Sequence, residues 1–579
     1  MTNAAVFFHP DAFDTSVPAL MGRQVAGESF LRGFLRHADV ERFYFWNAGD
    51  RPAAECEALL RRIAAPPKPV EWLGRNRHDR LAEPGCAFVS APANAKEAWN
   101  RRLLGSTRYS ICGLTHTTAS DVAMDELVAM LHAPVEPWDA LICTSRAVTD
   151  AVALQLDMAM AWFRERFGPA VRRPEIRLET IPLGINADDY ARSPEHRAAW
   201  RTRLGVGDDD IVVLYVGRLS MHAKMNPVPM AMALEKAARR TRRRVHWVLA
   251  GWAANDFLHR VFADAGPTFA PSVTTHVLDG RLPEVRLPIW SAGDVFLSLS
   301  DNIQETFGLT PVEAMAAGLP SVVSDWDGYR DLVRDGIDGF RVPTRAPRPG
   351  LAGDMAFRFA NRWEDYDHYV GMTSQFVAVD VDAAADALLA LFDNPDLRAR
   401  MAAAAVERAR AVFDWRTVIG QYQALWAELE AVRKAAPPRP PGPPSPWRPD
   451  PFALFAGYPT EALGADAVVA LAPGATAAVA AAMRDHPSVR YVNWAILTPE
   501  ELKAAFALLE ANGPTPVPAL VAAFPSARRG VAERSILWLA KFGMATLSPP
   551  GRARNTLVRS LSSGRPLAGP GGRAQDEGD

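Results

Sequence analysis

The chain has 579 residues, of which 49% are hydrophobic and 22% charged, and its formal net charge is −2. This length predicts two to four domains, and the composition is typical of a globular protein. The small net charge excludes a strong overall attraction to nucleic acid or acidic lipid. The sequence shows no secretory leader and no long apolar run, so we expect a cytoplasmic protein with at most peripheral membrane contact.

The four cysteines all lie before residue 150, and their spacing is not that of a metal site. Reduced thiols are therefore expected rather than disulfides. No His/Glu metal set and no G-x-x-x-x-G-K-[ST] phosphate loop occurs, so we expect neither a metal nor a cofactor.

Apolar strand patterns alternate with helical patterns along the first 433 residues. Strands are predicted at residues 4–8, 42–46, 109–114, 138–143, 210–219, 245–251, 273–278, 294–300 and 321–324. Residues 22–27 are predicted as a loop and residues 28–36 as a helix. This alternation predicts an α/β fold with parallel, doubly wound sheets, whose ligands bind at the carboxyl ends of the strands.

Residues 298–324 contain the densest set of functional signals. A strand is followed by a polar loop and by a predicted helix with Thr310 as its cap, Pro311 as its first helical residue and Glu313 as the fourth member of a capping box. A free helix N-terminus attracts anions, whereas Glu305 and Glu313 are suited to hydroxyl groups. A ligand with a phosphate and several hydroxyls, such as a sugar nucleotide, fits both features.

The sequence Glu305-Thr-Phe-Gly-Leu-Thr-Pro-Val-Glu313, continued by Ala-Met-Ala-Ala-Gly-Leu-Pro320, resembles the paired-glutamate signature of retaining glycosyltransferases of family 4. Thr306 departs from the more usual Gly or Ser. The resemblance covers residues 1 to about 433 and implies the GT-B fold, in which two Rossmann-like domains face each other across a cleft. The implied domains are residues 1–195 with a return helix at 415–433, and residues 205–412.

The resemblance also implies roles for single residues. Glu305 would contact the donor sugar and Glu313 the ribose, while Gly308, Leu309 and Thr310 would offer backbone N–H groups to the diphosphate. The alternative interpretations are a solvated loop acid for Glu305 and a helix-capping residue for Glu313.

Arg218 and Lys224, in Gly217-Arg-Leu-Ser-Met-His-Ala-Lys224, match the family's diphosphate-binding pattern, although they could also be surface charges. His116 matches the family's cleft histidine, which contacts the donor sugar and helps to place the acceptor; its alternative is a structural role. Gly27 is a weaker candidate for a loop that approaches an acceptor or a phosphate.

Two Asp-x-Asp triplets, Asp325-Trp-Asp327 and Asp380-Val-Asp382, resemble the metal-binding pairs of the other major glycosyltransferase fold. We interpret them as turn acids, because the cationic pair already serves the diphosphate.

The composition changes at a proline-rich linker, residues 435–452. Beyond it we predict a small, mostly helical module at residues 453–550 and a disordered tail at 551–579. Helices at 498–509, 515–524 and 532–541 and a β-wing at 543–547 resemble a winged helix. No basic recognition helix occurs, which favours docking of a protein partner over nucleic acid.

These observations predict a retaining, metal-independent glycosyltransferase of glycan or polysaccharide biosynthesis. It would move a sugar from a nucleotide-diphosphate sugar to an unidentified glycan or lipid-linked acceptor. Two alternatives remain. One is a sugar-nucleotide-binding scaffold that acts through its C-terminal module without turnover, and the other is a GT-B phosphorylase or epimerase.

Overall fold

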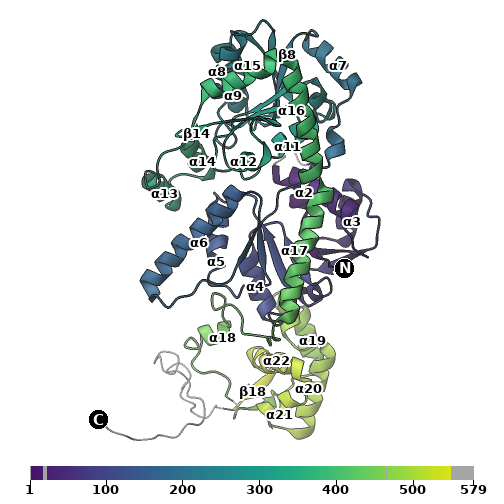
Figure 1. Cartoon of the computed structure of the whole chain (residues 1–579). Helices are drawn as coiled ribbons and strands as arrows, with labels where there is room; N and C mark the ends of the chain where they lie inside the picture. The colour runs from purple at the N-terminus through teal and green to yellow at the C-terminus, as the bar shows by residue number, and fades with distance from the viewer. Residues whose placement is uncertain (1, 17–21, 465, 549–579) are drawn as a thin grey trace, which may run out of the picture. The chain divides into compact units, whose positions relative to one another are not determined.

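The computed structural model describes residues 2–16, 22–464 and 466–548 (Figure 1). The chain divides into two compact units, residues 1–446 and 447–579. The predicted disordered tail and the last two residues of the predicted module lie outside the described residues.

The first half of the large unit is built on a parallel sheet with the strand order β3-β2-β1-β4-β5-β6-β7. Its strands are β1 Ala5–Phe8, β2 Phe43–Asn47, β3 Val70–Gly74, β4 Cys86–Val89, β5 Ser110–Leu114, β6 Ala140–Cys143 and β7 Arg177–Thr180. Its helices are α1 Pro10–Phe13, α2 Gly22–His37, α3 Ala53–Ile63, α4 Asn94–Arg102, α5 Asp121–Ala129 and α6 Arg146–Phe167. The central strands are buried, as expected for a parallel sheet covered on both faces.

The second half repeats this plan with the strand order β10-β9-β8-β11-β12-β13. The strands are β8 Ile211–Arg218, β9 Val245–Trp252, β10 Val273–Asp279, β11 Val295–Ser298, β12 Ser321–Ser324 and β13 Gly339–Val342. The helices are α7 Pro194–Leu204, α8 Pro227–Ala238, α9 Asp256–Phe269, α10 Pro283–Arg286, α11 Leu309–Ala316, α12 Tyr329–Leu332, α15 Val381–Asp393 and α16 Pro395–Arg408. Both sheets have the Rossmann strand order, so the predicted fold class is confirmed.

An insertion not predicted from the sequence follows β13. The short strands β14 Thr344–Arg345 and β15 Ala378–Val379 pair antiparallel and enclose helices α13 Gly353–Ala360 and α14 Tyr366–Ser374.

Helix α17, Trp415–Ala435, runs from the second half back onto α2 of the first. The Trp415 Nε1 donates to Ser29 Oγ at 2.8 Å, and the Gln423 side chain bonds the Asp39 backbone. Gly33 gives the tryptophan room, because a Cβ at Gly33 would lie 2.3 Å from the Trp415 ring. The same core cluster contains residues of both halves.

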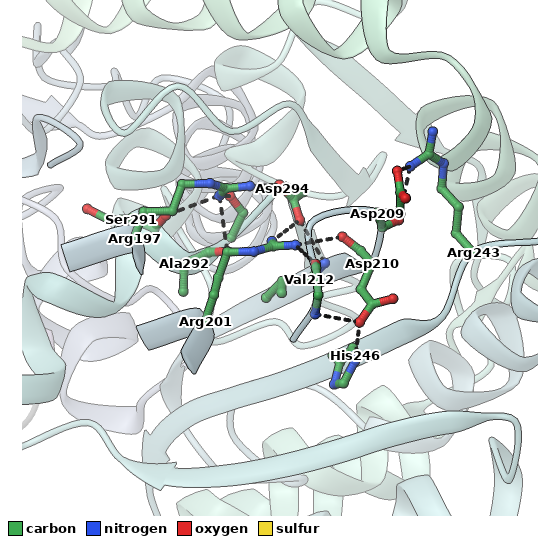
Figure 2. A network of polar contacts seen from close by, with 12 residues as sticks. Arg197, Arg201, Asp209, Asp210, Val212, Arg243, His246, Ser291, Ala292 and Asp294 are labelled. Atoms are coloured by element: carbon green, nitrogen blue, oxygen red, sulfur yellow. Dashed lines mark hydrogen bonds and ion pairs between the residues drawn. The ribbon is translucent and has the colours of Figure 1, made fainter. Parts of the chain in front are cut away.

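Helix α7 is fixed to the second sheet by a polar network at the edge where β8 begins (Figure 2). Arg197 and Arg201 of α7 donate to the two oxygens of Asp294 at 2.6 and 3.0 Å. Asp294 also accepts a bond from the Val212 backbone N–H at 2.9 Å. The network joins α7 to the second sheet. It lies at the end of the sheet opposite the carboxyl ends of the strands.

The prediction of a loop at residues 22–27 is wrong, because α2 already begins at Gly22. Gly27 lies inside this helix. A Cβ at Gly27 would lie 2.0 Å from the Ala12 carbonyl oxygen, so the glycine allows α1 to pack closely against α2.

The C-terminal unit has a small antiparallel sheet, β17-β16-β18, beside its helices. Its elements are α18 Pro451–Leu454, β16 Val468–Leu471, α19 Ala477–Asp485, α20 Pro499–Asn512, β17 Thr515–Pro516, α21 Val517–Ala522, α22 Arg529–Lys541 and β18 Ala545–Leu547. Thr498 and Glu501 form the capping box that starts α20, with both reciprocal bonds present.

Candidate functional site

A cavity of about 730 Å³ lies between the two halves of the large unit. The second half contributes the ends of β8 and β9, the loop before α11 and the start of α11, and the first half contributes the start of α2 and the loop after β5. The cavity is lined by eight of the nine predicted site residues: His116, Arg218, Lys224, Glu305, Gly308, Leu309, Thr310 and Glu313. The ninth, Gly27, is not among the lining residues, although Gly22, Arg23, Val25 and Ala26 of the same helix are.

Helix α11 begins at Leu309 with Gly308 at the cap position, two residues earlier than the prediction with its cap at Thr310. Gly308 has φ +103°, and a Cβ there would meet the Tyr329 ring at 2.3 Å, so both conformation and space require glycine. Thr310 therefore lies in the first turn, and the predicted Thr310–Glu313 capping box is wrong. The unpaired N–H groups of this first turn border the cavity.

Glu313 is buried, and its Oε1 accepts a hydrogen bond from the Tyr190 hydroxyl at 2.8 Å. Tyr190 belongs to the connector between the halves, residues Ala187–Tyr190. Burial raises the pKa of Glu313, and the bond from Tyr190 opposes that shift. The bond holds the carboxylate at the cavity wall and leaves its second oxygen for a ligand hydroxyl.

Glu305 is not a solvated loop acid, because only 9% of the residue is exposed. Its Oε2 lies 3.2 Å from the Lys224 Nζ. Arg218, at the end of β8, directs an Nη2 toward the Gln304 side chain at 3.4 Å. Two cations and one carboxylate thus meet where β8 and β11 end.

Thr306, the departure from the family pattern, connects the Glu305 loop to the first half. Its Oγ1 donates to the His116 carbonyl at 2.6 Å, and its own carbonyl accepts from Thr144 Oγ1 at 3.2 Å. Burial lowers the pKa of His116, which keeps the imidazole neutral at pH 7. A neutral histidine can both donate and accept hydrogen bonds at the cavity wall.

Helix α14 adds residues that the sequence did not identify. The Tyr366 and Thr117 hydroxyls lie 3.2 Å apart and join the two halves, while Asp367 lies 3.5 Å from the His222 Nε2. Tyr366 and Asp367 both line the cavity. The sequence marks the start of α14 only through the cap residue Asp365, which does not indicate a role at the cavity.

The acidic residues of the two Asp-x-Asp triplets contact protein groups. Asp380 caps α15, Asp382 pairs with Lys236 at 2.5 Å, and Asp325 pairs with Arg341 at 3.3 Å. Asp327 accepts from Ser145 Oγ at 3.4 Å. Among residues 2–16, 22–464 and 466–548, no group of three or more His, Cys, Asp or Glu side chains could hold a metal ion.

Burial, together with the charge of Glu305, raises the pKa of Asp327 to about 8. An unfolded aspartate has a pKa of about 4, so the folded chain binds this proton more tightly. The stabilising contribution is therefore fully present below about pH 4 and is lost as the pH rises through about 8.

The Asn side chain cannot ionise. We therefore expect Asp327→Asn to remove this pH-dependent loss of folding stability. Asn tolerates the φ of +43° found at this position. Between about pH 5 and pH 8 the wild-type melting temperature should fall relative to that of the variant, as measured by thermal unfolding. The exposed Asp125→Asn variant is the control and should follow the wild-type pH course. Parallel courses for wild type and Asp327→Asn would contradict a protonated Asp327.

Part of the chain is similar to known protein families. Residues 196–348 match the family model described as Glycosyl transferases group 1. This segment contains Arg218, Lys224, Glu305 and Glu313, but not His116.

The chain is 30% identical over 257 residues to a D-inositol 3-phosphate glycosyltransferase of Geodermatophilus obscurus, covering 42% of this chain and 53% of the relative. It is 37% identical over 307 residues to a phosphatidyl-myo-inositol mannosyltransferase of Mycobacterium leprae, covering 52% and 63%. The chain thus spans about half the length of the curated relatives it matches. Among solved structures it is similar to Anabaena HepE in complex with UDP, with 18% identity, a TM-score of 0.46 and coverage of 74% of this chain and 100% of HepE.

Within the described residues, no helix combines the length and the apolar character that crossing a bilayer requires.

Proposed function

We propose that the chain is a retaining glycosyltransferase of family 4 that transfers a hexose from a nucleotide-diphosphate sugar. The observation that carries this proposal is the convergence of Arg218, Lys224, Glu305, Glu313 and the start of α11 on one cavity. Cations and a helix N-terminus suit a diphosphate, and buried carboxylates suit hydroxyl groups. The similarity to glycosyltransferases supports the same function.

The proposed mechanism is a front-face displacement. The bond between the anomeric carbon and the diphosphate oxygen breaks, and its electron pair leaves with the diphosphate. The acceptor hydroxyl forms a new bond on the same face and passes its proton to a phosphate oxygen. Arg218 and Lys224 neutralise the charge that develops on the leaving group, which supports metal-independent transfer.

Glu313 would bind the ribose and Glu305 the donor sugar, whose oxocarbenium-like transition state a nearby negative charge stabilises. His116, from the other half, would place the sugar and the acceptor. Backbone N–H groups of Gly308, Leu309 and Thr310 would complete the diphosphate site.

We propose a cytoplasmic location, which the buried free thiols Cys56, Cys86, Cys112 and Cys143 support. The acceptor would be a glycan or a lipid-linked sugar, in glycan or polysaccharide biosynthesis. For the C-terminal unit we propose protein docking rather than nucleic-acid binding. Its Tyr491 and Trp494 are exposed, and aromatic side chains are enriched at protein interfaces.

The test is release of nucleoside diphosphate by the full chain from a panel of UDP-, GDP- and ADP-sugars, with and without EDTA. Ligand-induced melting shifts are measured in parallel. We expect release from one nucleotide class, unchanged by EDTA. A melting shift without release, even with candidate acceptors present, would favour the sugar-nucleotide-binding scaffold. No shift with any donor would contradict the proposal.

A further inference from the structure

Helix α6 has two apolar stripes on opposite sides. The buried stripe consists of Val148, Val152, Leu156 and Met160, which pack into the core of the first half. The second stripe consists of Leu154, Met158 and Trp162, which are 62%, 66% and 55% exposed. A helix on the surface of a sheet needs one apolar stripe for its packing. Among the described residues, the second stripe is therefore not needed to pack α6 onto the sheet.

The exposed stripe leads to a basic end of the helix. Phe167, the last residue of α6, is 70% exposed, and Arg164, Arg166 and Arg172 around it are exposed as well. These three arginines form no ion pair within the described part of the chain. Glu165 is the acidic residue among them. The arginines thus give this end of α6 a positive charge beside two large aromatic rings.

The acidic residues of the same face limit how deeply it can enter an apolar phase. Asp157 is paired with Arg173 at 2.5 Å, whereas Asp150 is exposed near the start of the helix. The polar and apolar side chains are therefore mixed along α6, as on helices that lie in an interface rather than span a membrane. In Figure 1, α6 is the long blue helix at the margin of the first half.

We propose that the outer face of α6 docks the chain onto an anionic lipid bilayer. Trp162 would lie at the level of the headgroups, Leu154 and Met158 would contact the acyl boundary, and the arginines at the end of the helix would bind lipid phosphates. The positive charge of this surface distinguishes a lipid bilayer from the other possible partners. Another protein or a second copy could cover the apolar stripe alone, whereas a lipid surface uses the stripe and the unpaired arginines together. The inference does not depend on catalysis, because binding to a bilayer needs no donor and no turnover.

The experiment is sedimentation of the full chain with vesicles of phosphatidylcholine and phosphatidylglycerol in equal parts, and with vesicles of phosphatidylcholine alone. We expect binding to the anionic vesicles that weakens with salt. The Met158→Ser/Trp162→Ser variant should bind at least about tenfold more weakly, because two apolar side chains no longer enter the interface. Arg164→Gln/Arg166→Gln should also weaken binding, and mainly at low salt.

The control is Trp494→Ser, which removes a more exposed tryptophan (79% against 55% for Trp162) from the C-terminal unit and should bind as the wild type does. Because all substituted side chains are exposed, unchanged melting temperatures are expected for the variants. Failure to bind anionic vesicles, or unchanged binding by Met158→Ser/Trp162→Ser, would overturn the proposal. Self-association without vesicles that the same variant abolishes would also overturn it, and would identify a second copy as the occupant.

Discussion

Glu305→Gln should lower the rate of nucleoside diphosphate release by about 100-fold or more, which is the scale of losing one electrostatic contact to a transition state. Gln keeps the shape of the side chain but removes the negative charge that we propose lies near the anomeric carbon of the donor. It also leaves Lys224, 3.2 Å from the present carboxylate, without its ion-pair partner. The rate is measured at saturating donor, so that a change in donor affinity does not enter the comparison.

The matched control is Glu284→Gln in α10. Glu284 is an exposed carboxylate that does not line the cavity, although its neighbours Val285 and Arg286 do. We expect the wild-type rate and the wild-type melting temperature for this variant. Equal rates for Glu305→Gln and wild type would exclude a catalytic role for the Glu305 charge.

Asp139→Ala should destabilise the first half by about 3–5 kcal/mol, which is typical when one partner of a buried ion pair is removed. The two Asp139 oxygens accept from Arg101 at 2.5 and 2.7 Å and from the backbone N–H groups of Ile111 and Glu136, both at 2.9 Å. Arg101 is fully buried, so the truncation leaves an uncompensated guanidinium in the core. Thermal unfolding should show a melting temperature lower by about 10 °C for the transition that includes this half.

Asp157→Ala is the control for this prediction. It also removes an ion pair, between Arg173 and Asp157, but the Asp157 side chain is 66% exposed. Exposed pairs contribute about 0–1 kcal/mol, so the melting temperature should hardly change. Similar shifts for both variants would mean that the burial of Arg101 and Asp139 has no energetic consequence.

The elements best predicted from the sequence are the buried strands, because a parallel strand covered on both faces is a continuous apolar run. The predicted strand at residues 321–324 matches β12 residue for residue. The edge strand β3, with the sequence VEWLG and partly exposed side chains, lacks that signal and is not predicted. The central strand β4, CAFV, is fully buried but only four residues long, and it is not predicted either. The α2 boundary was misplaced because Gly22 and Gly27 suggested a loop, whereas close packing against Ala12 requires the second glycine.

The part of the candidate site that could be predicted consists of residues that lie in one short segment of the sequence. Glu305, Gly308 and Glu313 are neighbours in sequence, but the start of α11 was not predictable, because it depends on the Tyr329 ring that only Gly308 accommodates. The bond between Tyr190 and Glu313 joins residues 123 positions apart, and the contact between Thr117 and Tyr366 joins residues 249 positions apart. Such contacts depend on how the two halves pack, for which a single sequence has no local pattern.

The most direct test is a crystal structure of the full chain with the nucleoside diphosphate that the release assay identifies. The proposal predicts the diphosphate at the start of α11, between Arg218 and Lys224, with a ribose hydroxyl within hydrogen-bond distance of Glu313. A nucleotide bound outside this cavity, or a diphosphate without contact to Arg218 and Lys224, would contradict the proposed donor site.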